Sequence, residues 1–330
     1  MAHPPATLPV HFIRHLTLNP ADHPRGQAHL SAASGLVRVR QRLFVVADDE
    51  LHLGVFKDHA APGAVGGEDT TPGTLVRLLE GELPHDKSKR KKAKPDLETL
   101  AHLPPLPGCP AGALLALGSG SKPQRETGVL VALDVHGVPN GRMATVDLCP
   151  LYAPLHKRFT DLNIEGAFVL SGELLLLHRG NKGDALSACI RFDWNLIAPW
   201  LAGREPKPPS AKSVQLMDLG EVEGVPLGLT DGTALQGGAW AFCAVAESTD
   251  NSYHDGACVG SAIGIVAPDG TLRHIYPLAG SPKVEGIAAR LQTQSPATPG
   301  DTRVFTLVTD PDDPHTPAQM LQTRLALNGD

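Results

Sequence analysis

The chain has 330 residues and a formal net charge of −6, with 42% hydrophobic and 19% charged residues, which suffices for a large buried core. This balance does not favour nucleic acid or an anionic membrane as a partner, and no apolar run is long enough to span a membrane. The first 20 residues lack the pattern of a signal peptide, and none of the five cysteines forms a CxxC pair. We therefore expect a cytoplasmic protein with reduced thiols.

Short apolar runs bounded by Gly, Pro, Asp or Asn predict strands and turns along most of the chain, and helical periodicity is nearly absent. A motif recurs about every 60 residues and begins a set of strand-like segments each time. Its five copies are Ser34-Gly35-Leu36, Glu98-Thr99-Leu100, Glu165-Gly166-Ala167, Leu227-Gly228-Leu229 and Glu285-Gly286-Ile287.

The first four copies each begin four segments, as in SGLVRVR, RLFVVADD, LHLGVFK and TLVRLLE. The fifth begins only three, and HFIRHLTL, residues 11–18, resembles the missing fourth strand. Four-stranded units repeated around an axis form a β-propeller, whose ring a strand from the other terminus can close. We predict an all-β, five-bladed β-propeller as a single domain over residues 1–330, with antiparallel blades near 34–84, 98–154, 165–220, 227–280 and 285–330 plus 11–18. A sandwich or an open barrel would not explain four strands per repeat.

Six basic residues interrupt the pattern in HDKSKRKKAKPD, residues 85–96. The ordinary interpretation is a solvated loop between the first two blades. The alternative is that the basic segment 87–94 captures an anionic ligand or partner.

The first strand of each propeller blade lines the central channel, so the motif residues are expected to converge at one mouth. Three of them are carboxylates, Glu98, Glu165 and Glu285, and Ser34 and Leu227 come from the other two blades. Crowded carboxylates need a cation or protonation, and ligands that offer only oxygen favour Ca²⁺. Gly166 would let its strand pack close to the axis. The alternative is that these glutamates bind only water or backbone amides.

The ends of the second strands should share this mouth and supply a binding site for a small molecule. Arg179 and Glu247 are the strongest candidates, because each ends an apolar strand and neither is a common turn residue. The other candidates are residues that turns commonly use, or residues next to them, so turn formation alone could explain their presence. They are Asp48, Asp49, Lys122, Arg125, Asn181 and Asp310. The chain has no GxxxxGK[ST] phosphate loop, no HExxH zinc motif and no GxSxG nucleophile elbow.

The segments AFCAVAESTDNSYHDG, SAIGIVAPDGTLR and SPKVEGIAARL resemble consecutive elements of the five-bladed calcium-activated nucleotidase (apyrase) family. FVVADDELHLGVF and LLLLHRGNKG resemble that family's strands of the first and third blades. The resemblance implies a channel Ca²⁺ held at Ser34, Glu98, Glu165 and Glu285, and Leu227 departs from the pattern. The chain also resembles uncharacterised bacterial propeller proteins and, more loosely, phytase-like and lactonase propellers.

The sequence thus leads to two hypotheses of different classes. The first is a metal-dependent hydrolase of a small anionic phosphate or carboxylate ester. In it, Ca²⁺ would polarise the substrate or a water, Arg179 with Lys122 or Arg125 would neutralise the anion, and Glu247 or Asp49 would be the general base. Asn181 and Asp310 would help to bind the substrate. The second is a non-catalytic binding or scaffold propeller in which a channel metal ties the blades together.

Overall fold

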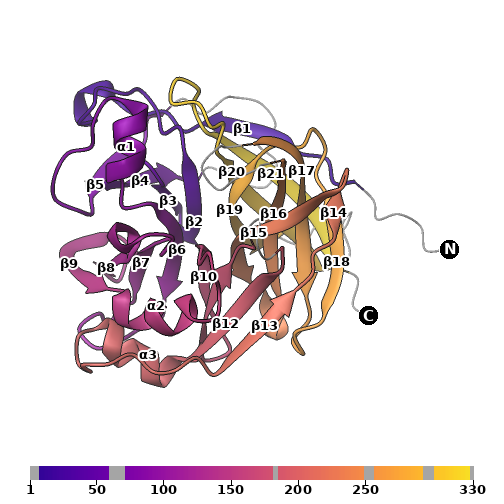
Figure 1. Ribbon diagram of the computed structural model, residues 1–330. Helices are drawn as coiled ribbons and strands as arrows, with labels where there is room; N and C mark the ends of the chain where they lie inside the picture. Colours follow the sequence, from indigo (N-terminus) through magenta and orange to yellow (C-terminus); the bar gives the residue numbers. More distant parts are fainter. Residues whose placement is uncertain (1–6, 59–70, 181–184, 249–255, 293–300, 328–330) are drawn as a thin grey trace.

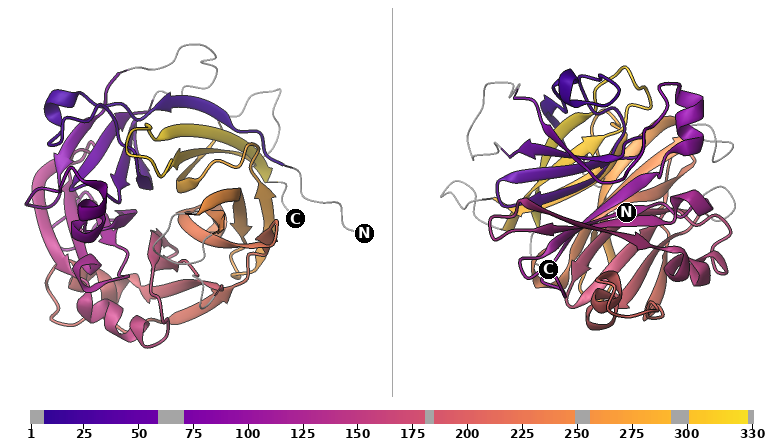
Figure 2. Two further views of the ribbon diagram at one scale, coloured as in Figure 1. Left: turned by 45° about the horizontal axis from the view of Figure 1, so that its top comes forward. Right: turned by 90° about the vertical axis from the view of Figure 1, so that its left-hand side faces the viewer.

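The computed structural model describes residues 7–58, 71–180, 185–248, 256–292 and 301–327. Five antiparallel sheets surround a central axis and form a five-bladed β-propeller, as the repeat predicts (Figure 1). The left view of Figure 2 shows the blades arranged in a ring. No helix in these ranges is long and apolar enough to cross a membrane.

Each blade runs outward from an inner strand beside the axis. The first blade contains β2 (Ala33–Val39), β3 (Arg42–Ala47), β4 (His52–Lys57) and β5 (Thr74–Arg77). The second contains β6 (Leu97–Leu103), β7 (Ala113–Gly118), β8 (Thr127–Leu133) and β9 (Pro139–Asp147). The third contains β10 (Ile164–Leu170), β11 (Glu173–His178), β12 (Ser187–Asp193) and β13 (Ser213–Met217).

The fourth blade contains β15 (Val225–Ala234), β16 (Trp240–Ser248), β17 (Ala257–Val266) and β18 (Leu272–Pro277), and β14 (Glu221–Val222) forms a short hairpin with β15. The fifth contains β19 (Val284–Leu291), β20 (Asp301–Thr309), β21 (Gln319–Leu327) and, from the other end of the chain, β1 (His11–His15). In this blade β1 pairs antiparallel with β21, so the predicted closure of the ring is confirmed.

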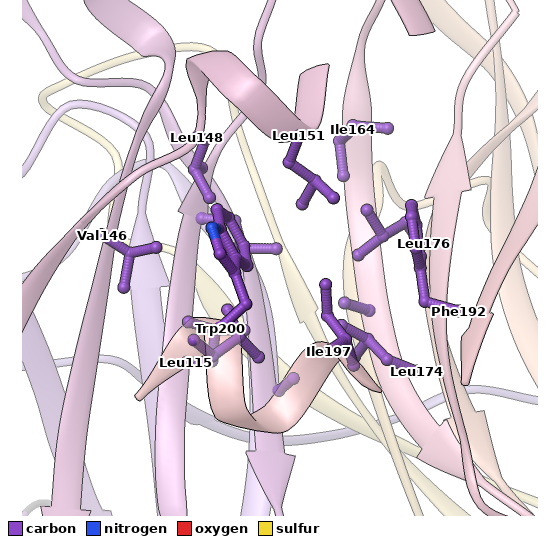
Figure 3. Packing of buried hydrophobic residues seen from close by; sticks show 14 of the residues in the cluster. Leu115, Val146, Leu148, Leu151, Ile164, Leu174, Leu176, Phe192, Ile197 and Trp200 are labelled. Carbon is purple, nitrogen blue, oxygen red and sulfur yellow. The ribbon is translucent and has the colours of Figure 1, made fainter. Parts of the chain in front are cut away.

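The second strands of the blades are largely buried because both of their faces are covered by neighbouring blades. All six residues of β7 are buried, and β11 is buried from Leu174 to His178. Two short helices, α2 (Cys149–His156) and α3 (Trp194–Leu201), extend the core at the outer side of the second and third blades. Figure 3 shows Leu151 and Trp200 of these helices packed with Leu115 and Leu176 of the two blades.

A third helix, α1 (Lys87–Ala93), contains most of the basic run, and the solvated loop expected there is not what forms. The side chain of Asp86 caps its first turn by accepting from the backbone N–H of Lys89 at 2.8 Å. Arg90 and Lys94 are buried, so one side of this segment belongs to the interior.

All five inner strands carry an irregularity of the β-bulge type, where one residue, or two in the first blade, is left out of the pairing with the second strand. A bulge re-aims the side chain of the unpaired residue. These positions are Ser34, with Gly35, in the first blade, Glu98, Glu165, Thr230 and Glu285. The motif copy at Leu227 is therefore a wrong prediction for this position: Thr230, three residues later, is the counterpart of the glutamates.

Glycines next to the bulges allow the inner strands to approach one another at the axis. A Cβ on Gly166 would lie 2.9 Å from Cα of Asp231, and one on Gly286 would lie 2.7 Å from the carbonyl oxygen of Ser34. Real Cβ atoms do not come this close to backbone atoms, so a larger residue would push the strands apart. This supports the role that the sequence predicts for Gly166.

Candidate functional site

One mouth of the channel opens into a cavity of about 1240 Å³, lined by the starts of inner strands and the ends of second strands. It gathers eleven of the twelve residues that the sequence selects: Ser34, Asp48, Asp49, Glu98, Lys122, Arg125, Glu165, Arg179, Glu247, Glu285 and Asp310. The twelfth, Asn181, lies outside the described residues. The inner-strand starts and second-strand ends do share one face, as propeller geometry requires.

Arg179, directly after β11, lies between three glutamates from three blades. Its guanidinium donates to Glu247 at 2.5 Å and lies 3.6 Å from Glu165 and 3.9 Å from Glu285. Gly228 of β15 makes room for it, because a Cβ there would lie 2.9 Å from Cγ of Arg179. A cation that the chain itself provides thus neutralises two of the four predicted metal ligands.

Lys283, two residues before Glu285, continues this group toward the fifth blade. Its ammonium lies 2.8 Å from Glu247, 3.8 Å from Glu285 and 2.6 Å from Asp312, and Asp310 is 3.6 Å away. We call Glu165, Arg179, Glu247, Lys283 and Glu285 the Arg179 cluster. Lys283 is missing from the sequence-derived set, although its Lys-x-Glu spacing places it on the same side of the strand as Glu285.

The other side of the mouth holds a second group, which we call the Lys94 cluster: Asp48, Lys94, Asp96 and Glu98. Lys94 donates to Asp48 and lies 2.8 Å from Asp96, and Arg125 lies 2.6 Å from Asp96. No ion pair of Glu98 is found within the described ranges. One oxygen each of Asp48, Asp96 and Glu98 lie within 4.8 Å of one another.

That spacing suits a single hard cation, because Ca²⁺ binds oxygens at 2.3–2.6 Å and opposite ligands then lie roughly 5 Å apart. Of the four ligands predicted from the sequence, only Glu98 belongs to this trio. Glu165 and Glu285 instead surround Arg179, and the hydroxyl of Ser34 donates to the carbonyl of Ala32 at 3.3 Å. The donor set therefore fits a divalent cation in the Lys94 cluster, where the ammonium of Lys94 would compete for two of the three carboxylates.

Asp49 and α1 form the outer wall beside the Lys94 cluster. Arg90 donates to Asp49 at 2.9 Å and to the carbonyl oxygens of Pro84 and His85, which fixes the helix against the first blade. Arg25 also lies 3.6 Å from Asp49. Two arginines thus neutralise this predicted general base. The same anchoring brings Lys92, an exposed cation of α1, to the cavity lining, along with Lys122 and Arg125 of the second blade.

The carboxylates of the mouth differ in pKa because the charges around them differ. Burial raises the pKa of Glu165 to about 7, with Glu247 adding to the shift and Arg179 and Lys283 opposing it. Burial and nearby acids raise the pKa of Glu98 and of Glu285 well above the ordinary value, and that of Asp310 to about 8. For Glu247 burial acts the same way, but Arg179 and Lys283 outweigh it and hold its pKa below the ordinary value.

Asp231, on the inner strand of the fourth blade, closes the bottom of this arrangement and is another residue that the sequence did not indicate. Its carboxylate accepts from the backbone N–H of Gly232 at 2.7 Å, of Ile287 at 3.0 Å and of Leu36 at 3.5 Å. These donors belong to the fourth, fifth and first blades. Asp231 therefore ties three inner strands together beneath the cavity.

Comparisons with known proteins add a family but no activity. A family model described as a family of unknown function (DUF6910) matches residues 90–314. No curated protein matches the chain.

Several solved structures are distantly similar to this chain. Glutaminyl cyclase of Myxococcus xanthus is 11% identical, with 98% of this chain and 100% of that chain covered and a TM-score of 0.47. The tail fibre of Staphylococcus aureus phage P68 is 10% identical over 97% and 53% of the two chains, with a TM-score of 0.43. A thermostable family-43 glycoside hydrolase is 13% identical over 91% of each chain, with a TM-score of 0.42. Similarities this distant do not indicate what the site binds or does.

Proposed function

The chain belongs to DUF6910, a family of unknown function, and we propose from its own site that it is a metal-dependent hydrolase of a small anionic ester. The observation that carries the proposal is the trio Asp48, Asp96 and Glu98, whose oxygens lie within 4.8 Å of one another at the wall of a cavity of about 1240 Å³. Such a set of carboxylates is the ligand type that Ca²⁺ prefers.

A cation held by the trio would supply Lewis-acid polarisation of a substrate oxygen or of a water. The protein would bind the anionic part of the substrate beside the trio through Lys122, Arg125 and Lys92 of α1, all of which line the cavity. The substrate class is a phosphate or carboxylate ester, because both present an anion to such cations.

Glu165 is the best-suited proton acceptor of the mouth. A general base works best when its pKa lies near the working pH, and that of Glu165 is raised to about 7. The sequence proposes two other bases. Glu247 has a lowered pKa and its carboxylate forms ion pairs with Arg179 and Lys283. Asp49 is paired with two arginines. Arg179 would orient Glu165 from 3.6 Å and compensate charge that develops nearby.

A non-catalytic binding or scaffold propeller is the second candidate, and a specific observation favours it. Arg179, Lys283 and Lys94 already neutralise most carboxylates of the mouth from within the chain. Such a network can serve to hold five blades together without any chemistry. Both candidates allow a metal, but only the first requires turnover.

The experiment combines Ca²⁺-dependent melting with turnover of 4-nitrophenyl phosphate and 4-nitrophenyl hemisuccinate. Ca²⁺ should raise the melting temperature of EDTA-treated protein more than Mg²⁺ does, because the trio offers a wide, carboxylate-only site. Glu98→Gln should abolish this rise, and in EDTA it should be neutral or stabilising because it removes a repelling buried acid.

Glu173→Gln is the matched control, because Glu173 begins β11 at the other end of its blade and pairs with Arg191 at 3.0 Å. It should leave the Ca²⁺ response and turnover unchanged. A Ca²⁺ response without turnover of either ester would leave the binding propeller as the function. If Ca²⁺ has no effect and Glu98→Gln changes nothing, the metal-dependent proposal is wrong.

A further inference from the structure

The end of the propeller opposite the cavity carries three arginines where the first and last blades meet. Arg290 of β19 lies opposite Val304 of β20, and Val304 lies opposite Arg324 of β21. Directly paired residues of an antiparallel sheet point to the same face. Arg290 and Arg324 therefore flank Val304 on one face of the fifth blade.

Arg38 of the first blade reaches this same face. Its Nη2 donates to the hydroxyl of Thr306 at 2.8 Å, and Thr306 is two residues from Val304 on β20, so the two share a face. Nearer the cavity this interface is apolar, with Leu36 of the first blade packed with Ala288 and Val308 of the fifth. The apolar packing thus gives way to a group of three arginines at the far end.

The positive charge of these three arginines is only partly compensated. Asp58 pairs with Nη1 of Arg38. Within the part of the chain that the structure describes, Arg290 and Arg324 have no ion pair. The Nε atoms of Arg38 and Arg290 are buried and have no hydrogen-bond partner there. Buried guanidinium N–H groups without acceptors are costly, so a bound acceptor would stabilise this group of arginines.

The titration behaviour agrees with this geometry. Burial and the neighbouring Arg290 lower the pKa of Arg38 to about 10. Burial and Arg324 likewise lower the pKa of Arg290. Burial and a neighbouring arginine thus destabilise the charged forms of Arg38 and Arg290, which a nearby anion would offset.

We propose that Arg38, Arg290 and Arg324 bind a small oxyanion, with phosphate as the best-matched chemistry, where the first and fifth blades meet. The planar guanidinium fork donates two parallel N–H groups to such an oxyanion, which a lysine cannot do. Because these residues come from β2, β19 and β21, the bound anion would link the first blade to the last. This site is separate from the cavity at the mouth and does not depend on the function proposed for it.

Isothermal titration of the full chain with inorganic phosphate tests the site, with phenyl phosphate as a second ligand. The titration uses Lys122→Gln protein, so that binding at the mouth contributes less. We expect phosphate to bind and to raise the melting temperature. Arg290→Gln and, separately, Arg324→Gln should each weaken binding by about tenfold or more, the effect of losing one charge-assisted contact.

Arg273→Gln is the control, because Arg273 of β18 is an exposed arginine of another blade, 4.0 Å from Asp269. It should change phosphate affinity by less than about twofold. Tight phosphate with weak phenyl phosphate would identify the free ion as the ligand, and equal binding would identify a phosphate ester; either supports the site. The Arg324 variant alters an exposed side chain and so guards against misfolding of the Arg290 variant. Absence of phosphate binding, or equal loss in the Arg273 control, would overturn the proposal.

Discussion

The Arg179 cluster and the Lys94 cluster contain the same kinds of side chain, yet their charges are balanced differently. Arg179 and Lys283 together contact all three glutamates of their cluster. On the other side, Lys94 contacts Asp48 and Asp96, and Glu98 has no ion pair within the described residues. The comparison shows that the protein's own cations contact every glutamate in one half of the mouth, whereas one carboxylate of the other half has no such contact among the described residues.

The largest effect is expected from breaking the Arg179 cluster. Arg179→Gln would leave Glu165, Glu247 and Glu285 together with Lys283 as the remaining cation. Removing one partner of a buried ion pair costs about 3–5 kcal/mol, because the other charge stays buried. We expect a loss of this size in the free energy of urea unfolding at pH 7.

Arg191→Gln is the matched control, since Arg191 of β12 serves a single carboxylate, Glu173, at 3.0 Å. It should cost about 1 kcal/mol or less. Equal losses for the two variants would mean that the glutamates of the mouth do not depend on Arg179, and the comparison of the two clusters would fail.

A smaller effect is expected when the pH changes the protonation of the buried carboxylates. The pKa of Asp310 is raised from 3.8 to about 8, and that of Glu165 from 4.5 to about 7, both chiefly by burial. For each of these groups, the folded state binds more protons than the unfolded state at any pH between the ordinary pKa and the raised pKa. Stability should be greatest below pH 4 as far as these groups are concerned, and it should be lost as the pH rises to about 8.

In EDTA, the free energy of unfolding should therefore fall between pH 5 and pH 8, by up to about 1.4 kcal/mol per pH unit for each such proton. Asp310→Asn should flatten this fall. Asp313→Asn is the control, because backbone hydrogen bonds lower the pKa of Asp313 and it does not titrate in this window. An unchanged slope in the Asp310 variant would show that Lys283 keeps Asp310 ionised throughout.

The blades could be predicted from the sequence because each strand carries its own signal. Runs such as ALLALG and ELLLLH are apolar on both faces, and Gly, Pro or Asp residues mark their ends. The closing strand followed from counting, since the fifth set lacked one segment. These features depend on local composition and on the repeat, and both can be recognised without knowledge of the tertiary contacts.

The details of the mouth could not be predicted in the same way. The bulge at Thr230 depends on the pairing of β15 with β16, and Leu227-Gly228 imitates the motif because Gly228 must accommodate Arg179. Lys94 lies in a basic run that looks solvated, and only its alternate spacing with Asp96 and Glu98 signals one shared side of the chain. Ion pairing across blades decides which carboxylates remain available, and no local pattern records it.

The smallest effect is expected at Ser34, the remaining predicted metal ligand. Its hydroxyl donates to the carbonyl oxygen of Ala32 at 3.3 Å, a long bond within one chain segment, and it belongs to neither cluster. Ser34→Ala should therefore change the free energy of unfolding by about 0.5 kcal/mol or less, because such a weak local bond has little net value. The melting response to Ca²⁺ should also be unchanged, whereas Asp96→Asn, measured beside it, should reduce that response. If Ser34→Ala instead abolishes the response while Asp96→Asn preserves it, the ion lies on the axis among the inner-strand residues. The Lys94 cluster would then be only an ion-pair network, and both halves of the mouth would be balanced from within the chain.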